Sequence, residues 1–294
     1  MMKFKALIPV VAIVLILQGC ATQQLTNQGK SAYEQGDYDA ALQNFEQVIN
    51  TSEEAGNSAD AEVYFKAGMA AWELGQTQKA IRYLEKAEYL EYPSPQLYIT
   101  LARAAQSIDN LSKELDALEN YRKKFPKGKR IDSMSLRLFE TYVESENWKK
   151  ATNLWPKIKD QAQSDVNLLT GYLKVNNKLE KDKTADRVAE KILEQDPDNL
   201  AALEWMGKKY FWKAEDVYVE EMTDYKNNRT TSQYKRLLNK LDEVYPTFEK
   251  ALDYFLKLYK MDPRPEYAEF LGNIYKRLQE EQKAEYYYKK AKNK

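Results

Sequence analysis

Two residue counts limit the side chains that are available for chemistry in this chain. The 294 residues contain no histidine and one cysteine, Cys20. Without histidine, Ser-His-Asp and Cys-His nucleophilic catalysis are excluded, and so are zinc and non-haem iron sites that use histidine ligands. One cysteine excludes an intrachain disulfide, a CxxC redox pair and a cysteine-held metal cluster. We therefore expect no metal and no cofactor, and carboxylates, lysines and tyrosines remain as the reactive groups.

One pair of carboxylates has a spacing that could support catalysis. Glu140 and Glu144 are four residues apart, which places both on one face of a helix. Glycoside hydrolysis uses two carboxylates about 5–10 Å apart in a groove, so a carboxylate-dependent, glycan-processing enzyme is one interpretation. Such pairs are common, however, in a chain in which 31% of the residues are charged. We expect a protein that is not an enzyme and keep the glycan-processing α-solenoid as the alternative.

Residues 1–19 have the pattern of a targeting segment. Lys3 and Lys5 precede an apolar run from Ala6 to Leu17, which suits a signal peptide but is shorter than the roughly 20 residues that cross a bilayer. The run ends in the sequence LQGC at residues 17–20. This sequence resembles the lipobox of bacterial lipoproteins, and the resemblance implies lipid attachment at Cys20 after cleavage of the leader. An ordinary signal peptide with an incidental cysteine, or an uncleaved anchor, is the alternative.

The residue after the cysteine and the net charge indicate a location and a class of partner. Ala21 in place of an aspartate implies, by the same resemblance, transfer to the outer membrane, with the protein facing the periplasm. Lys and Arg number 45, and Asp and Glu also number 45. This balance argues against a nucleic-acid partner, because nucleic-acid binders carry a clear basic excess. We expect contact with the membrane through the N-terminal lipid, and contact with partners in the cell envelope.

A repeated pattern organises the residues after Cys20. Two segments align residue by residue: Gly29, Tyr33, Gly36 and Ala41 in the first, and Gly68, Trp72, Gly75 and Ala80 in the second. The pattern resembles the tetratricopeptide repeat (TPR), a helix–turn–helix unit of about 34 residues. Small residues let its two helices cross closely, and Pro126, Pro197 and Pro263 fall where the second helix must end.

The spacing of the pattern predicts about seven repeats in one domain, residues 20–294. Their expected ranges are 22–55, 61–94, 95–128, 132–165, 166–199, 200–263 and 265–294. A single repeat leaves its apolar face uncovered, so neighbouring repeats must stack into a solenoid. The fold class expected is therefore an all-α, TPR-type α-solenoid, and the resemblance implies that its superhelix is right-handed.

Repeat six contains an insert at about residues 214–245. Apolar residues recur at helical spacing on both sides of a polar turn at residues 227–232. Thr231 or Ser232 is the expected cap of the helix that follows. Both helices of this repeat should therefore be lengthened into a projecting hairpin. Two interpretations remain open, an arm that binds a partner and an extension that packs only on itself.

The resemblance to TPR proteins also implies which side chains line a concave groove. The candidate partner-binding residues are Phe65, Met69, Trp72, Arg103, Lys174, Lys208, Phe211 and Trp212. Apolar anchors with a few charges suit the capture of a protein or peptide. The alternative is that Trp72 and Phe211 pack against the next repeat. Together these features predict a membrane-anchored scaffold or adaptor lipoprotein that binds protein or peptide partners.

Overall fold

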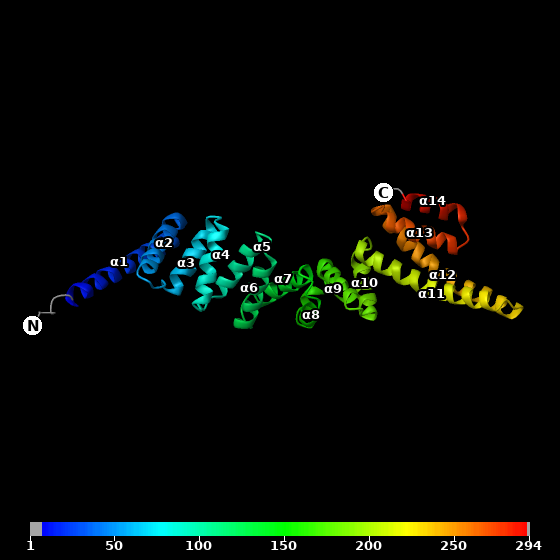
Figure 1. Ribbon diagram of the computed structural model, residues 1–294, viewed down its shortest axis with the longest axis horizontal. Helices are drawn as coiled ribbons and strands as arrows, with labels where there is room; N and C mark the ends of the chain where they lie inside the picture. The colour runs from blue at the N-terminus through cyan, green and yellow to red at the C-terminus, as the bar shows by residue number, and fades with distance from the viewer. Residues whose placement is uncertain (1–7, 293–294) are drawn as a thin grey trace, which may run out of the picture. The chain divides into compact units, whose positions relative to one another are not determined.

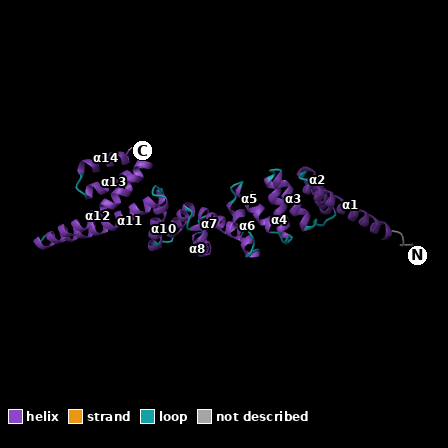
Figure 2. Ribbon diagram, turned by 180° about the vertical axis from the view of Figure 1, so that it is seen from behind, coloured by secondary structure: helices purple, strands orange, loops and turns teal. Residues whose placement is uncertain are grey.

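The computed structural model describes residues 8–292, and it describes side chains from residue 21 onward. Figure 2 shows helices joined by short loops, with no strand in this part of the chain. The helices, in chain order, are α1 (Ile8–Glu34), α2 (Tyr38–Glu54), α3 (Ala61–Glu73), α4 (Thr77–Tyr89), α5 (Pro95–Gln106), α6 (Leu111–Lys124), α7 (Ile131–Glu144), α8 (Trp148–Ala162), α9 (Val166–Lys178), α10 (Asp182–Gln195), α11 (Leu200–Asn227), α12 (Thr231–Met261), α13 (Pro265–Arg277) and α14 (Glu281–Lys292) (Figure 1). The predicted all-α solenoid of helical pairs is confirmed.

The helices belong to two compact units. The first comprises residues 1–147 and the second residues 148–294. Helices α1–α7 therefore lie in the first unit and α8–α14 in the second. The boundary falls inside the range 132–165 that the sequence pattern assigns to repeat four.

Close helix crossings explain the small residues of the pattern. Ala41 in α2 and Ala80 in α4 are fully buried. Gly68 in α3 packs so closely on α4 that an added Cβ would stand 2.7 Å from Leu84 Cγ and 3.1 Å from the Leu84 backbone nitrogen. A side chain at residue 68 would thus force the two helices apart.

The turn between the paired helices uses one backbone conformation repeatedly. Gly36 and Gly75 have φ angles of 79° and 70°. The corresponding turns of other pairs place residues with side chains in the same left-handed region, namely Asp109, Glu146, Glu180 and Gln279, with φ between 53° and 64°. This conformation is favourable for glycine and costs free energy for residues with a Cβ.

The second unit contains the lengthened helical pair. Helices α11 and α12 have 28 and 31 residues, whereas α13 and α14 have 13 and 12. Within this unit, the free end of the pair extends beyond α13 and α14 (Figure 1, yellow). The cap of α12 is Thr230, whose side chain accepts from the backbone N–H of Gln233 at 3.2 Å. The prediction of Thr231 or Ser232 as the cap is wrong by one or two residues, because α12 already begins at Thr231.

Candidate functional site

The predicted lipid-attachment residue lies outside the described side chains. Residues 1–7 are not described, and the chain from Ile8 through Cys20 is described only as backbone within α1. The cleavage site and the acylation of Cys20 therefore stay predictions. Within residues 8–292, none of the helices has the length and apolar character to cross a membrane.

Two of the groove residues predicted in the first unit are buried. Phe65 and Met69 are each 7% exposed. The Phe65 ring stacks on Tyr92 with ring centres 4.6 Å apart, and the Thr100 hydroxyl donates to the Met69 sulfur at 3.5 Å. Both side chains thus fill the space between α3 and the start of α5, and they leave little area for a partner.

Trp72 and Arg103, the other predicted groove residues of the first unit, are more exposed than Phe65 and Met69. Trp72 is half-buried and Arg103 is exposed. Glu62, on the same face of α3 as Phe65, is already paired with Lys30 at 2.8 Å. The predicted groove of the first unit is therefore smaller and less charged than the sequence pattern indicates.

The two lysines predicted as groove residues in the second unit have different environments. Lys174 is exposed, with its ammonium 5.4 Å from the centre of the Trp148 ring. Lys208 binds Glu204 at 2.6 Å and Glu266 at 2.8 Å. Burial lowers the pKa of Lys208, but its hydrogen bonds to the two carboxylates outweigh this effect and raise the pKa overall. Lys208 is thus committed to ion pairs inside the unit.

Phe211 and Trp212 are adjacent in sequence and opposite in environment. Phe211 is 4% exposed and contacts Phe248 and Phe270 edge to face, with ring centres 6.1 and 5.0 Å away. Trp212 is 54% exposed. The burial of Phe211 agrees with the alternative of packing against the next repeat. Trp212 contacts the Phe211 and Phe270 rings edge to face, and more than half of its surface remains exposed.

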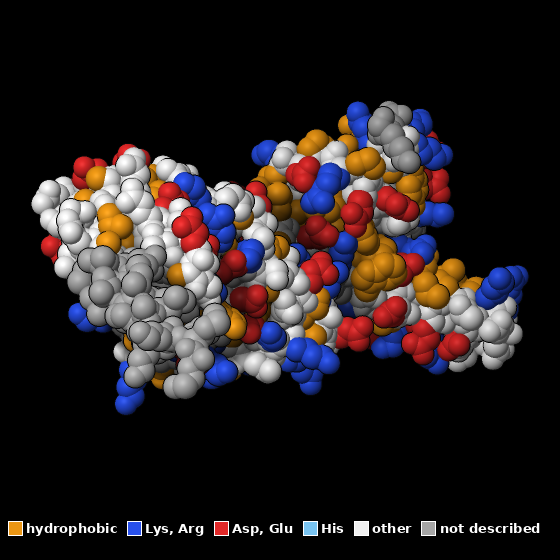
Figure 3. Space-filling view, turned by 60° about the vertical axis from the view of Figure 1, so that its left-hand side comes forward, with side chains coloured by type: hydrophobic (Ala, Val, Ile, Leu, Met, Phe, Trp, Pro, Cys, Tyr) orange, Lys and Arg blue, Asp and Glu red, His pale blue; other side chains and the backbone are white. Residues whose placement is uncertain are grey.

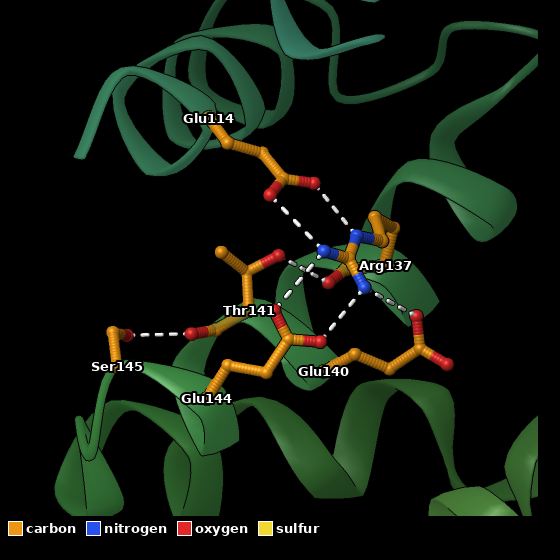
Figure 4. Close-up of polar contacts among 6 residues, drawn as sticks. All are labelled: Glu114, Arg137, Glu140, Thr141, Glu144 and Ser145. Atoms are coloured by element: carbon orange, nitrogen blue, oxygen red, sulfur yellow. Dashed lines mark hydrogen bonds and ion pairs between the residues drawn. The ribbon is translucent and has the colours of Figure 1, made fainter. Parts of the chain in front are cut away.

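The carboxylate pair considered for catalysis is engaged by an arginine. The guanidinium of Arg137 donates to Glu140 at 3.2 Å and to Glu144 at 3.0 and 3.2 Å, and it also binds Glu114 (Figure 4). The hydrogen bonds to Glu114, with those to Glu144, raise the pKa of Arg137 above its ordinary value. Glu140 and Glu144 therefore act as partners of a permanently charged cation.

The lengthened pair, which we call the arm (residues 214–245), is held together along one side. Leu237 and Val244 of α12 are buried, and Glu221 of α11 is 5% exposed. The Arg236 guanidinium binds Glu221 at 2.8 Å, which compensates the buried carboxylate. The arm therefore packs on itself in part, as one of the two interpretations proposed.

The other side of α11, from the base of the arm outward, carries large apolar residues that stay partly exposed. Trp212, Val219 and Met222 of α11 are 54%, 47% and 38% exposed. Their spacing of seven and three residues aligns them on one helix face. We call these three residues the apolar stripe. Figure 3 shows hydrophobic side chains gathered where the arm leaves the rest of the second unit.

A cavity of about 430 Å³ adjoins the apolar stripe. Its lining residues are Tyr218, Val219, Met222, Thr223, Tyr225, Lys226, Arg229 and Arg277. Arg277 of α13 is held at 2.8 Å by Glu215 and lies over the Tyr218 ring, 4.3 Å from its centre. Hydrogen bonds to Glu215 raise the pKa of Arg277. Lys226 and Arg229 form no ion pair within the described residues, so the rim of the cavity is positive.

Comparisons with known proteins agree with this architecture. Residues 22–88 match the family model of the tetratricopeptide repeat. Residues 22–88 are therefore tetratricopeptide repeats. A solved structure from Bacteroides ovatus is 23% identical over 76% of this chain and 99% of its own, with a TM-score of 0.53, and it supports the fold. No curated protein sequence matches the chain.

Two further solved TPR proteins are less similar. A TPR protein from Parabacteroides merdae is 14% identical over 92% of this chain and 92% of its own, with a TM-score of 0.41. YrrB, described as a TPR protein with an unusual peptide-binding site, is 14% identical over 61% of this chain and 89% of its own, with a TM-score of 0.46.

The sequence pattern singled out Trp212 of the apolar stripe but not Val219 and Met222. Val219 and Met222 follow the helical periodicity of α11, and this alone does not distinguish a buried face from an exposed one. The usable signal was the run Val217-Tyr218-Val219, because consecutive apolar residues exceed what one helix face can bury.

Proposed function

We propose that this chain is a non-catalytic scaffold lipoprotein of the cell envelope, and that it binds a partner protein at the base of the arm. The observation that carries the proposal is the apolar stripe Trp212, Val219 and Met222, exposed beside a cavity with a positive rim. Its partner would present apolar side chains, with acidic groups facing Lys226 and Arg229.

Burial of the apolar stripe by a partner lowers the free energy of the complex. Fully burying a side chain of this size stabilises a complex by about 1.5–3 kcal/mol relative to leaving it in water. Soluble proteins seldom leave large apolar residues adjacent without using them for recognition. Aromatic and methionine side chains are also enriched at the centres of protein interfaces. Trp212 and Met222 are therefore the expected anchors for a partner.

The membrane anchor rests on the sequence at residues 17–20. After cleavage of residues 1–19, acylation of Cys20 would attach the chain to the membrane at its new first residue, with the rest of α1 and the helical pairs following it along the chain. More than one acyl chain makes such an attachment durable. We propose the periplasmic face of the outer membrane as the location, because alanine follows the cysteine.

A photo-crosslinking experiment tests the partner site. The photoreactive residue benzoylphenylalanine is placed at position 219, and in a matched control at position 235, where Lys235 is exposed on α12 of the same hairpin. We expect irradiation of cells to give one discrete adduct from position 219 and none from position 235. Equal labelling from both positions, or from neither, would contradict the proposed site.

The anchor is tested separately by membrane fractionation. Cys20→Ser should move the protein from the membrane fraction to the soluble periplasmic fraction, because the thiol that carries the lipid is gone. The position 219 adduct should still form in this variant if the partner is soluble. A membrane distribution identical to that of the unmodified chain would refute the lipid anchor and leave the partner site untouched.

A further inference from the structure

A second cavity lies in the second unit, away from the arm. It has a volume of about 420 Å³ and opens between α8 and α10, over α9. We call it the α8–α10 groove, and its lining residues are Trp155, Pro156, Lys159, Gln163, Leu169, Tyr172, Thr184, Arg187, Val188 and Lys191. Three of these side chains are cations and none is acidic. The groove lies between the second helices of adjacent pairs, and it shares no residue with the cavity beside the apolar stripe.

The three cations lack carboxylate partners within the described residues. The ammonium of Lys191 donates to the side-chain oxygen of Gln163 at 3.2 Å. The guanidinium of Arg187 donates to the backbone oxygen of Lys183 at 3.3 Å and to the Thr184 hydroxyl at 3.5 Å. These acceptors are neutral, so the positive charge of the groove is not compensated. Arg277 and Lys208 in the same unit, in contrast, are each neutralised by glutamate.

The floor of the groove is apolar and fixed. Leu169 and Val188 are buried. The ring of Trp155 stacks on that of Tyr172, with ring centres 3.9 Å apart and planes 5° from parallel. An apolar floor beneath charged rims can hold one apolar side chain while the rims bind charges on either side of it. Lys159 supplies a cation from α8, and Arg187 and Lys191 supply two from α10.

The first unit contains an equivalent groove whose charge is balanced. It lies between α2 and α4, and Arg82 and Lys86 line it. These residues follow Ala80 by the same spacing at which Arg187 and Lys191 follow Ala185. Glu53 and Glu85, however, line the groove of the first unit as well. By the same register, Gln163 takes the place of Glu53, and Lys159 takes the place of Ile49. Glu190, the counterpart of Glu85, does not line the α8–α10 groove, so of these two grooves the one in the second unit has an excess of positive charge.

We propose that the α8–α10 groove binds an acidic segment of a partner protein, in which one apolar side chain lies between carboxylates. The apolar side chain packs on the floor, and the carboxylates bind Lys159 on one rim and Arg187 and Lys191 on the other. A free phosphate ion would use the cations but gain nothing from the floor. This inference rests on the proposed scaffold function and assigns it a second, charge-selective contact.

The test uses the full chain and a fluorescein-labelled synthetic peptide in which Asp and Glu flank one tryptophan. Fluorescence anisotropy should show binding that weakens as salt is added. The affinity for the peptide should also fall about tenfold when Arg187→Gln is combined with Lys191→Gln. The matched control, Arg82→Gln with Lys86→Gln, should bind the peptide as the unmodified chain does. Unchanged thermal unfolding of both variants shows that the fold is intact.

Four results would overturn the inference. The first is that the acidic peptide does not bind, and the second is that a peptide with Asn and Gln in place of Asp and Glu binds equally well. The third is that both double variants lose the same affinity for the peptide. The fourth is that inorganic phosphate, at the concentration of the peptide, displaces it completely. The peptide could fail to bind while the chain binds vesicles of anionic phospholipid. If the Arg187 and Lys191 changes abolish that vesicle binding, the groove binds lipid instead. The position 219 adduct does not depend on this groove. Its persistence in the Arg187/Lys191 variant separates failure of this inference from failure of the proposed function.

Discussion

The guanidinium of Arg137 holds the buried carboxylate of Glu114 through two parallel hydrogen bonds. Arg137 Nε donates to Glu114 Oε1 at 2.6 Å, and Nη2 donates to Oε2 at 3.0 Å (Figure 4). The Glu114 side chain is 2% exposed and that of Arg137 is 25% exposed. Glu114 occupies the turn of α6 where α4, α8 and α10 carry Ala80, Ala151 and Ala185. The pair thus joins α6 to α7 at a position where other repeats use only close packing.

Removing the arginine should destabilise the chain strongly. Arg137→Ala leaves the Glu114 carboxylate buried without a cation, and we expect a loss of about 3 kcal/mol in the free energy of unfolding. Glu114→Ala should cost about 1 kcal/mol or less, because alanine is the ordinary residue at this crossing. The double variant should resemble Glu114→Ala. Urea unfolding measures all three, and equal losses from the two single variants would show that the carboxylate is not effectively buried.

A glycine in one turn should stabilise the fold. Glu180 has a φ angle of 54°, which glycine adopts without the clash of a Cβ. We expect Glu180→Gly to raise the free energy of unfolding by about 0.5 kcal/mol, since the relief of strain exceeds the entropy lost. Gly75→Ala is the reciprocal control. No atom lies within 4 Å of the added Cβ, so its expected loss of about 1 kcal/mol reports the φ angle of 70° alone.

Substitution of the adjacent residues Phe211 and Trp212 should change the stability of the fold by different amounts. Phe211→Ala empties a site enclosed by Phe248 and Phe270, and we expect it to cost about 3–4 kcal/mol of stability. Trp212→Ala removes a side chain that is 54% exposed and should cost less than about 1 kcal/mol. Thermal unfolding followed by circular dichroism distinguishes the two variants. A large loss from Trp212→Ala would place this residue in the core and remove it from the proposed partner site.

The stability of the first unit should depend on the protonation of Glu88. Burial raises the pKa of this carboxyl, although Lys124 and a hydrogen bond from Asn120 at 2.9 Å oppose the effect. The folded state therefore binds the proton more tightly than the unfolded chain. The resulting stability is fully present below the ordinary pKa of glutamate, and it is lost as pH rises through the raised pKa.

Glu88→Gln should accordingly be more stable than the unmodified chain at neutral pH. The advantage should disappear below about pH 4, where Glu88 is protonated in both states. Urea midpoints measured across this pH range check the prediction, and the same substitution at exposed Glu54 is the matched control. An advantage for Glu88→Gln that is independent of pH would show that desolvation of the charge is not its cause.

The sequence predicted the helical pairs because their determinants are local. Gly68 and Ala80 mark a close crossing, and Gly36 and Gly75 mark turns with positive φ. Proline residues 126, 197 and 263 follow the ends of α6, α10 and α12. Such features repeat along the chain, so the spacing alone indicates both the elements and their order.

The candidate site was harder to predict because it depends on contacts between distant residues. Glu114 departs from the pattern, but nothing in its spacing indicates Arg137, which lies in the following helix. Phe65, Met69 and Phe211 fit a groove position of the family pattern and are nevertheless buried. Phe65 packs on Tyr92, Met69 contacts Thr100, and Phe211 contacts Phe248 and Phe270. Exposure of Val219 and Met222 follows from the greater length of α11 relative to α13, and a periodic pattern does not reveal which face a neighbour covers.

The most direct test of the partner site uses the partner protein that is captured by crosslinking at position 219. Its affinity is measured for the unmodified chain and for a variant of this chain in which the apolar stripe is changed. Val219→Ser combined with Met222→Ser removes two apolar contacts and should weaken binding at least tenfold by calorimetry. Lys235→Ser should bind normally, and the urea midpoints of both variants should match that of the unmodified chain. An unchanged affinity for the stripe variant, with its fold intact, would contradict recognition through the arm.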